Sequence, residues 1–200
     1  MKKQSLLTVS DQTGKVYEIS LEGDIIRIMN YTGSDLEGVC FNNEEQIIAV
    51  TEERSREVVF LDYPEGNEIS RYKINVEIQA ENKGLEGISY NSNNNMYYIL
   101  NEALPGQLLI WNPDLGLIGT EEPDFASDYS GLCVDAPASC LWILSDESAL
   151  FSKCDYKANP LITFMLTKTK FEGIAVDEDQ NLVYLVNDGS SMMDCYKLIY

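Results

Sequence analysis

The segment Asp35–Asn42 reads DLEGVCFN, and its pattern returns three more times along the chain. The later copies are GLEGISYN at residues 84–91, DYSGLCVD at residues 128–135 and KFEGIAVD at residues 170–177. Their shared glycines, at positions 38, 87, 131 and 173, lie 49, 44 and 42 residues apart. This spacing is typical of the blades of a β-propeller and is too long for helical repeats such as ankyrin, at about 33 residues.

Each copy of this segment is followed by a polar turn and by further apolar runs. In the unit that begins at residue 35, the runs are 47–51, 58–62 and a weaker one at 69–74. Short runs rich in β-branched and aromatic residues, bounded by turn formers, predict strands joined by hairpins. The residues before position 35 match the unit from its second strand onward, and the last unit stops before a fourth strand.

These units predict an all-β protein, a propeller of about five four-stranded blades. A single domain over residues 1–200 is expected, with blades at about 1–33, 34–82, 83–126, 127–169 and 170–200. Because the first strand of the first unit is absent, we expect an incompletely closed ring in which the two end blades each expose a sheet edge. One explanation is that the chain is a shortened form of a longer protein. We also expect Trp111 and Trp142, which sit inside strands, to pack between blades.

The chain is strongly acidic and contains no histidine. Its formal net charge is −19, from 33 acidic and 14 basic residues. Repulsion from phosphates and anionic lipids makes nucleic acid and membrane surfaces poor partners, and no apolar run is long enough to insert into a membrane. Cations or basic partners remain, beside the simpler explanation that the charges only keep the protein soluble. The absence of histidine excludes Ser-His-Asp and Cys-His catalysis and histidine-based zinc or copper sites.

The cysteines and the N-terminus bear on the cellular location. The five cysteines are Cys40, Cys133, Cys140, Cys154 and Cys195. Each lies in a strand-like run outside any C-x-x-C pair, so we interpret them as small buried hydrophobic residues, although Cys133 and Cys140 could face each other across a hairpin. Their odd number favours a reducing compartment. The apolar stretch near the N-terminus, residues 6–9, is too short for a signal peptide.

Two sets of acidic residues are expected to meet at one mouth of the central channel. In an up-and-down blade the first strand starts where the second strand ends, because the two form an antiparallel hairpin. The set that precedes the repeat glycines is Glu37, Glu86 and Glu172, with Ser130 in the remaining copy. The set that ends the second strands is Asp11, Glu52, Glu102, Asp146 and Asp188. Within a unit, the two positions are 15, 16, 16 and 16 residues apart.

Eight carboxylates at one mouth would repel one another unless something neutralises them. Oxygen ligands without histidine or cysteine favour Ca²⁺ or Mg²⁺, and a flexible arrangement of several carboxylates favours Ca²⁺. We therefore predict a calcium site formed from Glu37, Glu86, Glu172, Glu52, Glu102, Asp146 and Asp188. The alternative is structural: acids at strand starts and hairpin ends also accept backbone N–H bonds, and the repetition in every blade suits that role.

The ordered series of these segments resembles the bacterial SdiA-regulated (YjiK-like) β-propeller family. The resemblance rests on the four glycine-centred segments together with VTEER at residues 50–54 and LSDES at residues 144–148, and it covers about residues 5–198. It implies a calcium-regulated propeller that is exported or membrane-anchored. This chain shows no N-terminal anchor, so its location stays open. The resemblance assigns no catalytic residue.

Three functions are compatible with these features. The first is a non-enzymatic, calcium-associated binding or scaffold module, with a protein or small-molecule ligand at the channel mouth. The second is a metal-dependent hydrolase of phosphoesters or lactones, in which Glu37, Glu86 and Glu172 hold the ion and an acid of the second set acts as general base. The third is a ring for protein interactions that holds no ion.

Overall fold

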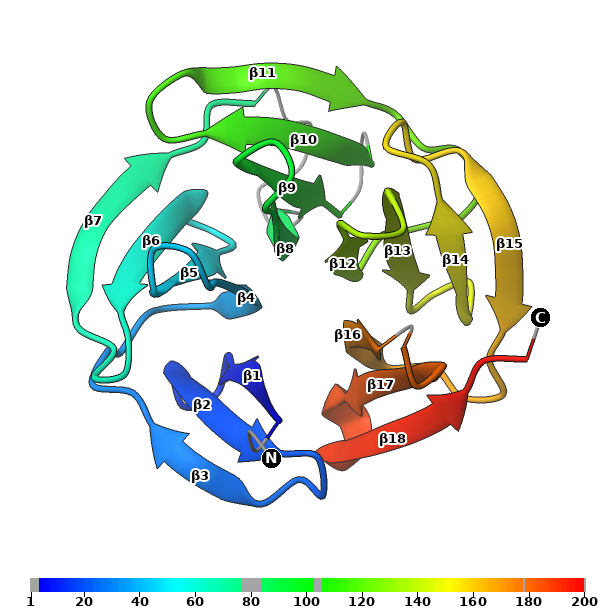
Figure 1. The fold of residues 1–200 in the computed structure, drawn as a ribbon, viewed down its shortest axis with the longest axis horizontal. Helices are drawn as coiled ribbons and strands as arrows, with labels where there is room; N and C mark the ends of the chain where they lie inside the picture. The colour runs from blue at the N-terminus through cyan, green and yellow to red at the C-terminus, as the bar shows by residue number, and fades with distance from the viewer. Residues whose placement is uncertain (1–3, 77–83, 103–105, 178, 200) are drawn as a thin grey trace.

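Five small antiparallel sheets surround a central axis in the computed structural model (Figure 1). The structure describes residues 4–76, 84–102, 106–177 and 179–199. Over these residues the sheets contain three, four, four, four and three strands, in chain order. The predicted fold, an all-β propeller with five blades, is confirmed.

The strands of each sheet follow one another along the chain. The first blade holds β1 (Ser5–Ser10), β2 (Lys15–Ser20) and β3 (Ile25–Ile28). The second holds β4 (Leu36–Asn42), β5 (Ile47–Glu52), β6 (Glu57–Asp62) and β7 (Glu68–Lys73). The third holds β8 (Leu85–Asn91), β9 (Met96–Asn101), β10 (Gln107–Asn112) and β11 (Gly116–Glu121). The fourth holds β12 (Gly131–Asp135), β13 (Cys140–Ser145), β14 (Leu150–Cys154) and β15 (Pro160–Met165). The fifth holds β16 (Phe171–Asp177), β17 (Leu182–Asn187), the 3-10 turn η1 (Asp188–Ser190) and β18 (Met192–Lys197).

The glycine-centred segments form the strands nearest the axis. These are β4, β8, β12 and β16, and each packs against the next one around the ring (Figure 1). Each segment ends in Asn or Asp because that side chain closes the hairpin to the second strand. The side chain of Asn42, for example, accepts hydrogen bonds from the backbone N–H groups of Glu44 and Glu45 at 3.0 and 3.2 Å, which is an Asx-turn.

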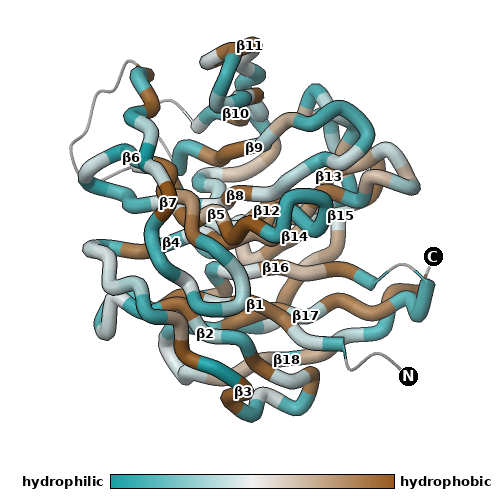
Figure 2. Tube along the Cα trace, turned by 60° about the vertical axis from the view of Figure 1, so that its left-hand side comes forward, coloured by the Kyte–Doolittle hydropathy of each residue, from teal (hydrophilic) through white to brown (hydrophobic). Residues whose placement is uncertain are grey.

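The hydrophobic core lies between the blades rather than in one central mass. Four clusters fill the junctions between blades one and two, two and three, three and four, and four and five. Trp111 packs against Phe60 of the preceding blade, and Trp142 belongs to the cluster that also contains Phe171 of the following blade. Both tryptophans therefore pack between blades, as predicted. Figure 2 shows the hydrophobic stretches lying along the strands, with hydrophilic residues at the turns.

The repeat glycines allow the inner strands to approach closely. A Cβ at Gly38 would overlap the carbonyl oxygen of Glu86 and lie 2.9 Å from the backbone nitrogen of Ile88. The same contact region is bridged by Thr51, whose hydroxyl accepts from the Gly38 N–H at 2.7 Å and donates to the Glu86 carbonyl at 2.9 Å. Only a residue without a side chain fits at this junction, and the same holds at Gly87, where a Cβ would lie 2.8 Å from the Leu132 nitrogen.

The cysteines do not all match their predicted environment. All five are free; Cys140 and Cys154 are buried, whereas Cys40 and Cys133 are half-buried. Cys195 is exposed, so its prediction as a buried residue is wrong: it lies on β18, which has no outer strand beside it among the described residues. Cys133 pairs with Trp142 in the hairpin, and Cys140 pairs with Asp135. In the described part of the chain, no helix has the length and hydrophobicity to cross a membrane.

Candidate metal site at the acidic channel mouth

Glu37, Glu86 and Glu172 all lie at the starts of inner strands, where the sheet ladder is interrupted. The pairing with the second strand shifts between Leu36 and Val39, and again at the equivalent places in β8 and β16. Such a bulge redirects the side chain at the interruption. The three carboxylates are half-buried, and among the described residues none of them accepts a hydrogen bond.

The register shows which acids end the second strands. The backbone N–H groups of Glu53, Glu102 and Asp188 each donate to the residue two positions before the repeat glutamate, at 2.9, 3.0 and 2.9 Å. Glu53 therefore occupies the position equivalent to Glu102, Asp146 and Asp188, while Glu52 is equivalent to Asn101 and Asn187. The equivalence of Glu53 to these acids could be read from the sequence, because Glu53 follows Glu37 by 16 residues, the same separation as in the other units.

Glu52 serves the junction between the first two blades. It is 5% exposed. Its carboxylate accepts hydrogen bonds from the Tyr31 hydroxyl at 2.7 Å, the Ser34 N–H at 3.1 Å and the Ser55 hydroxyl at 3.1 Å. Arg71 Nη1 lies 3.4 Å from its second oxygen. The structure does not bring Glu52 together with the other acids that the sequence proposed.

Five carboxylates from the second and third blades form a continuous cluster, which we call the acidic mouth. Oxygen atoms of Asp35, Glu37 and Glu53 lie within 4.8 Å of one another, and so do those of Glu53, Glu86 and Glu102. Glu53 belongs to both groups. Sequence reasoning found three of these residues and missed Asp35 and Glu53.

Burial and mutual repulsion raise the pKa values of the acidic mouth. Burial is the main cause of a pKa of about 8 for Glu37, with further contributions from Glu172 and Glu53. The pKa of Glu86 is also raised well above its ordinary value, first by burial and then by Glu37 and Glu102. Burial raises the pKa of Glu53 too, although a 3.0 Å hydrogen bond from the Gly84 N–H opposes the shift.

Two basic side chains offset part of this charge. Arg54 Nε forms an ion pair with Asp35 Oδ2 at 3.0 Å, although the Arg54 side chain is largely exposed. The pair does not have hydrogen-bond geometry, so this buried oxygen has no hydrogen-bond donor among the described residues. Arg56 is buried, donates to the Asn101 side chain at 3.0 Å, and interacts electrostatically with Glu53.

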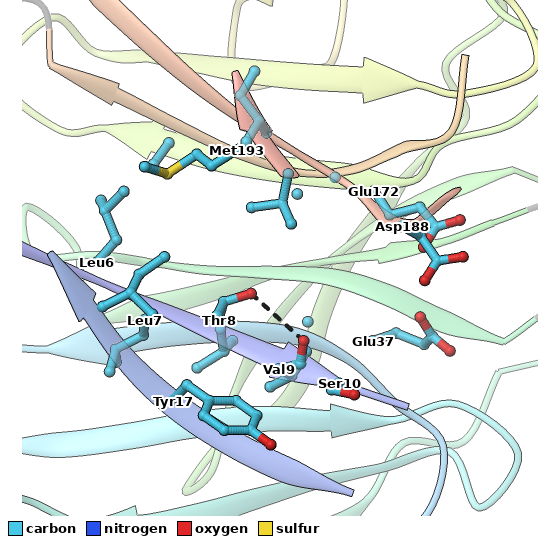
Figure 3. A pocket seen from close by; sticks show the side chains of 18 of the residues that line it. Leu6, Leu7, Thr8, Val9, Ser10, Tyr17, Glu37, Glu172, Asp188 and Met193 are labelled. Atoms are coloured by element: carbon cyan, nitrogen blue, oxygen red, sulfur yellow. Dashed lines mark hydrogen bonds between the residues drawn. The ribbon is translucent and has the colours of Figure 1, made fainter. Parts of the chain in front are cut away.

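The remaining predicted acids lie beside the fifth blade. The pKa of Glu172 is raised to about 7, mainly by burial and then by Asp188 and Asp146, while Lys170 opposes the shift. Figure 3 shows Glu37, Glu172 and Asp188 gathered at one end of a cavity of about 570 Å³. The cavity is also lined by Asp11 and by all four repeat glycines, so it includes the central channel.

The structural explanation holds for Asp146 and Glu52 of the second set but not for the first set. Asp146 accepts a hydrogen bond from the Lys170 N–H and lies 3.9 Å from its ammonium group. Glu52 is fully engaged at its blade junction, as described above. Glu37, Glu86 and Glu172 have no such partners among the described residues, so turn capping does not account for them.

The opposite mouth of the channel has a different character. A second cavity of about 640 Å³ lies there, lined by Phe41, Tyr90 and Tyr184 together with Asp135 and Asp177. The two ends of the channel are therefore distinct, and the cluster of carboxylates with raised pKa values lies at one of them.

Comparisons with known proteins match the fold and the repeat. The sequence model of the SdiA-regulated family matches residues 1–191. Among solved structures, the chain is similar to the β-propeller domain of Cps50 (Swd1) from Myceliophteria thermophila, with a TM-score of 0.58 and 6% identity over 94% of this chain and 63% of that one. A chain of the mitotic checkpoint complex gives a TM-score of 0.63 and 11% identity over 98% of this chain and 62% of that one. The chain thus spans slightly less than two thirds of these structures, and the likeness concerns the fold alone.

Proposed function

The chain belongs to the SdiA-regulated family, and on that premise we propose that it is a non-enzymatic, calcium-associated propeller that serves as a binding or scaffold module. The observation that carries this proposal is the acidic mouth. Its two groups of three carboxylates share Glu53. The second group combines Glu53 of blade two with Glu86 and Glu102 of blade three, so an ion in that group would join the two blades.

The chemistry of the acidic mouth suits Ca²⁺. Calcium takes six to eight oxygen ligands at about 2.3–2.6 Å. Oxygens on one ion therefore lie within roughly 5 Å of one another, and each of the two groups meets this condition at 4.8 Å. The raised pKa values of Glu37 and Glu86 report unfavourable burial and repulsion, both of which a divalent cation would relieve. Glu53, common to both groups, is the residue on which binding should depend most.

The test is a calcium titration of the melting temperature after removal of metal with a chelator, together with elemental analysis of the purified protein. Binding to the folded state at a hundredfold excess over Kd adds about 2.7 kcal/mol. For a chain of this size that corresponds to a rise of roughly 5–10 °C. Unchanged melting on addition of Ca²⁺ would contradict the proposal.

Variants locate the site. Glu53→Gln should abolish most of the calcium-induced rise, whereas Glu65→Gln, at an exposed position away from the mouth, should leave it intact. Glu52→Gln distinguishes the role of Glu52 from that of Glu53. We expect this variant to have a lower melting temperature without calcium, because it weakens the contacts to Tyr31 and Arg71. The calcium-induced rise should be preserved. A loss of the rise in Glu52→Gln but not in Glu53→Gln would place the ion elsewhere.

A metal-dependent hydrolase is the second candidate. It is favoured by one observation: Glu37 and Glu172, with pKa values of about 8 and about 7, line the cavity beside the acidic mouth. Carboxylates that titrate near neutral pH suit general acid–base catalysis. Calcium-dependent hydrolysis of p-nitrophenyl phosphate or γ-butyrolactone that is lost in Glu37→Gln would select this function over the non-enzymatic one.

A further inference from the structure

The junction between the fifth and the first blade differs from the other four. Each of those contains a hydrophobic cluster with members from both blades. Over the described residues no cluster joins the fifth blade to the first. A hydrogen bond from Gln180 Nε2 to Gln4 Oε1, at 3.3 Å, crosses this junction at the surface. The cavity of about 570 Å³ extends into it, with walls from both blades.

β1 carries an unpaired edge toward the channel. Ser10 at the end of β1 pairs with Lys15 of β2, just as Asn187 at the end of β17 pairs with Met192 of β18. Since β17 and β18 are the second and third strands of their blade, β1 is the second strand of its own blade. The second strands β5, β9 and β13 are paired on both sides and are buried along almost their whole length. β1 is only half-buried from Leu6 to Ser10, and in the described part of the chain no strand lies on its inner side. An unpaired edge presents backbone N–H and C=O groups to which another strand can bind.

Gly173 of the fifth blade borders the same unfilled space from the opposite side. Gly38, Gly87 and Gly131 each face the backbone of the next inner strand, and a Cβ at Gly87 would lie 2.8 Å from the Leu132 nitrogen. A Cβ at Gly173 would meet only Val186 of its own blade, at 3.5 Å. Gly173 is also half-buried, whereas the other three glycines are buried. The space into which it faces is therefore the place of an inner strand beside β1.

The walls of this space carry two kinds of side chain. Leu6, Val186 and Met193 line its apolar part, while Asp11, Glu37, Glu172 and Asp188 line the part at the end of β1. Figure 3 shows this separation, with Leu6 and Met193 lying away from the carboxylates of Glu37, Glu172 and Asp188.

We propose that this groove binds an extended peptide that adds to β1 as the inner strand of the first blade. The peptide would run antiparallel to β1 and place a glycine near Gly173, in the arrangement of the other junctions. Apolar side chains after the glycine would contact Leu6 and Met193. A lysine or arginine just before the glycine would lie among the carboxylates.

Charge decides the chemistry of this partner. The residue before the glycine would come between Glu37 and Glu172, with Asp11 and Asp188 nearby. A glutamate there, as in the chain's own repeat, would add a fifth carboxylate to a site that already holds four. A basic residue would be attracted to all four, so the groove selects a cationic strand through charge complementarity.

The direct test uses labelled synthetic peptides and fluorescence polarisation, with a chelator present so that calcium plays no part. The probe is Gly-Leu-Lys-Gly-Ile-Ser-Tyr-Asn, which is the sequence of residues 84–91 with lysine in place of glutamate. The matched control retains the glutamate. We expect the lysine peptide to bind at least about tenfold more tightly at low salt and to weaken as salt is added. Equal affinities, or no binding of either peptide, would overturn the proposal.

Two variants test the position. Gly173→Leu should fill the groove and abolish binding, while the protein still folds, because an added side chain there meets only ordinary contacts. The matched control is Gly119→Leu on β11, where the nearest atom to a Cβ is Ile110 Cδ1 at 3.6 Å. We expect similar melting temperatures for both variants and retained binding in Gly119→Leu. Undiminished binding by Gly173→Leu would contradict the proposal.

Hydrogen exchange identifies the bound edge. Addition of the lysine peptide should protect backbone amides of Ser5–Ser10, with little change in β11. The proposal would fail if β1 were already protected in the peptide-free protein, if this protection increased with protein concentration, and if light scattering detected a dimer. Those results would show that a second copy of the chain occupies the groove.

Discussion

Glu37 combines the features of the acidic mouth in one residue. It precedes a repeat glycine, it lies at a bulge in β4, and it faces carboxylates of its own and other blades. Because burial is the largest cause of its raised pKa, the free energy of the metal-free protein should depend on pH.

The unfolded chain releases glutamate protons near pH 4–5, whereas the folded protein holds those of Glu172 and Glu37 to about pH 7 and about pH 8. The folded state therefore binds more protons across this window, and the free energy of unfolding falls as pH rises through it. Glu37→Gln should flatten this dependence. In a chelator, its melting temperature should exceed that of the wild type by a few degrees at pH 9 and lose this advantage at pH 4.

The control for the pH series is Glu65→Gln, which should follow the wild-type curve at every pH. If Glu37→Gln and the wild type lose stability in parallel from pH 5 to pH 9, the carboxylate of Glu37 is not a source of the pH dependence.

At the scale of the strands, the repeat glycines set the distance between blades. Gly38 and Gly173 stand at equivalent positions, but only Gly38 is closed in by the next inner strand. Gly38→Ala should destabilise the protein by about 1–3 kcal/mol, because the overlap is with backbone atoms that cannot rotate away. Gly173→Ala should be nearly neutral. Thermal melting of this pair measures the difference directly, and equal losses would show that blade five is packed as tightly as blade two.

The contrast between Glu52 and Glu53 is also a property of the strand. Successive residues at the end of β5 point to opposite sides of the sheet. The carboxylate of Glu52 faces the junction with the first blade and contacts Tyr31 and Arg71. The carboxylate of Glu53 faces Glu86 and Glu102 of the third blade. Adjacent identical residues thus contribute to two unrelated interactions.

For the whole molecule, the net charge of −19 opposes the compact state. Sodium chloride screens this repulsion, so it should raise the melting temperature at pH 8. The rise should be smaller at pH 4.5, where many carboxylates are protonated. This measurement also controls the calcium titration: a specific site predicts that millimolar Ca²⁺ raises the melting temperature far more than Na⁺ at equal ionic strength. Equal effects of the two salts would indicate screening alone.

The repeat, the strands and the all-β propeller fold follow from the sequence by itself. Each blade is a meander of neighbouring strands, so its pattern of apolar runs and Asx-turns is local, and a fixed period repeats it. The sequence also placed Glu37, Glu86 and Glu172 at the start of inner strands, because that position is defined by the glycine beside it.

Only the tertiary structure decided which carboxylates meet. Asp35 and Glu53 belong to the acidic mouth because of the register between β4 and β5, which sets the side of the sheet that each residue faces. A register shift of one residue would turn each side chain to the opposite side. The exposed edge of the first blade was predicted from its missing first strand, but the residues of β1 and β16 that line the groove depend on contacts between opposite ends of the chain. Such contacts arise when the blades close into a ring, and local sequence patterns do not encode the distances between them.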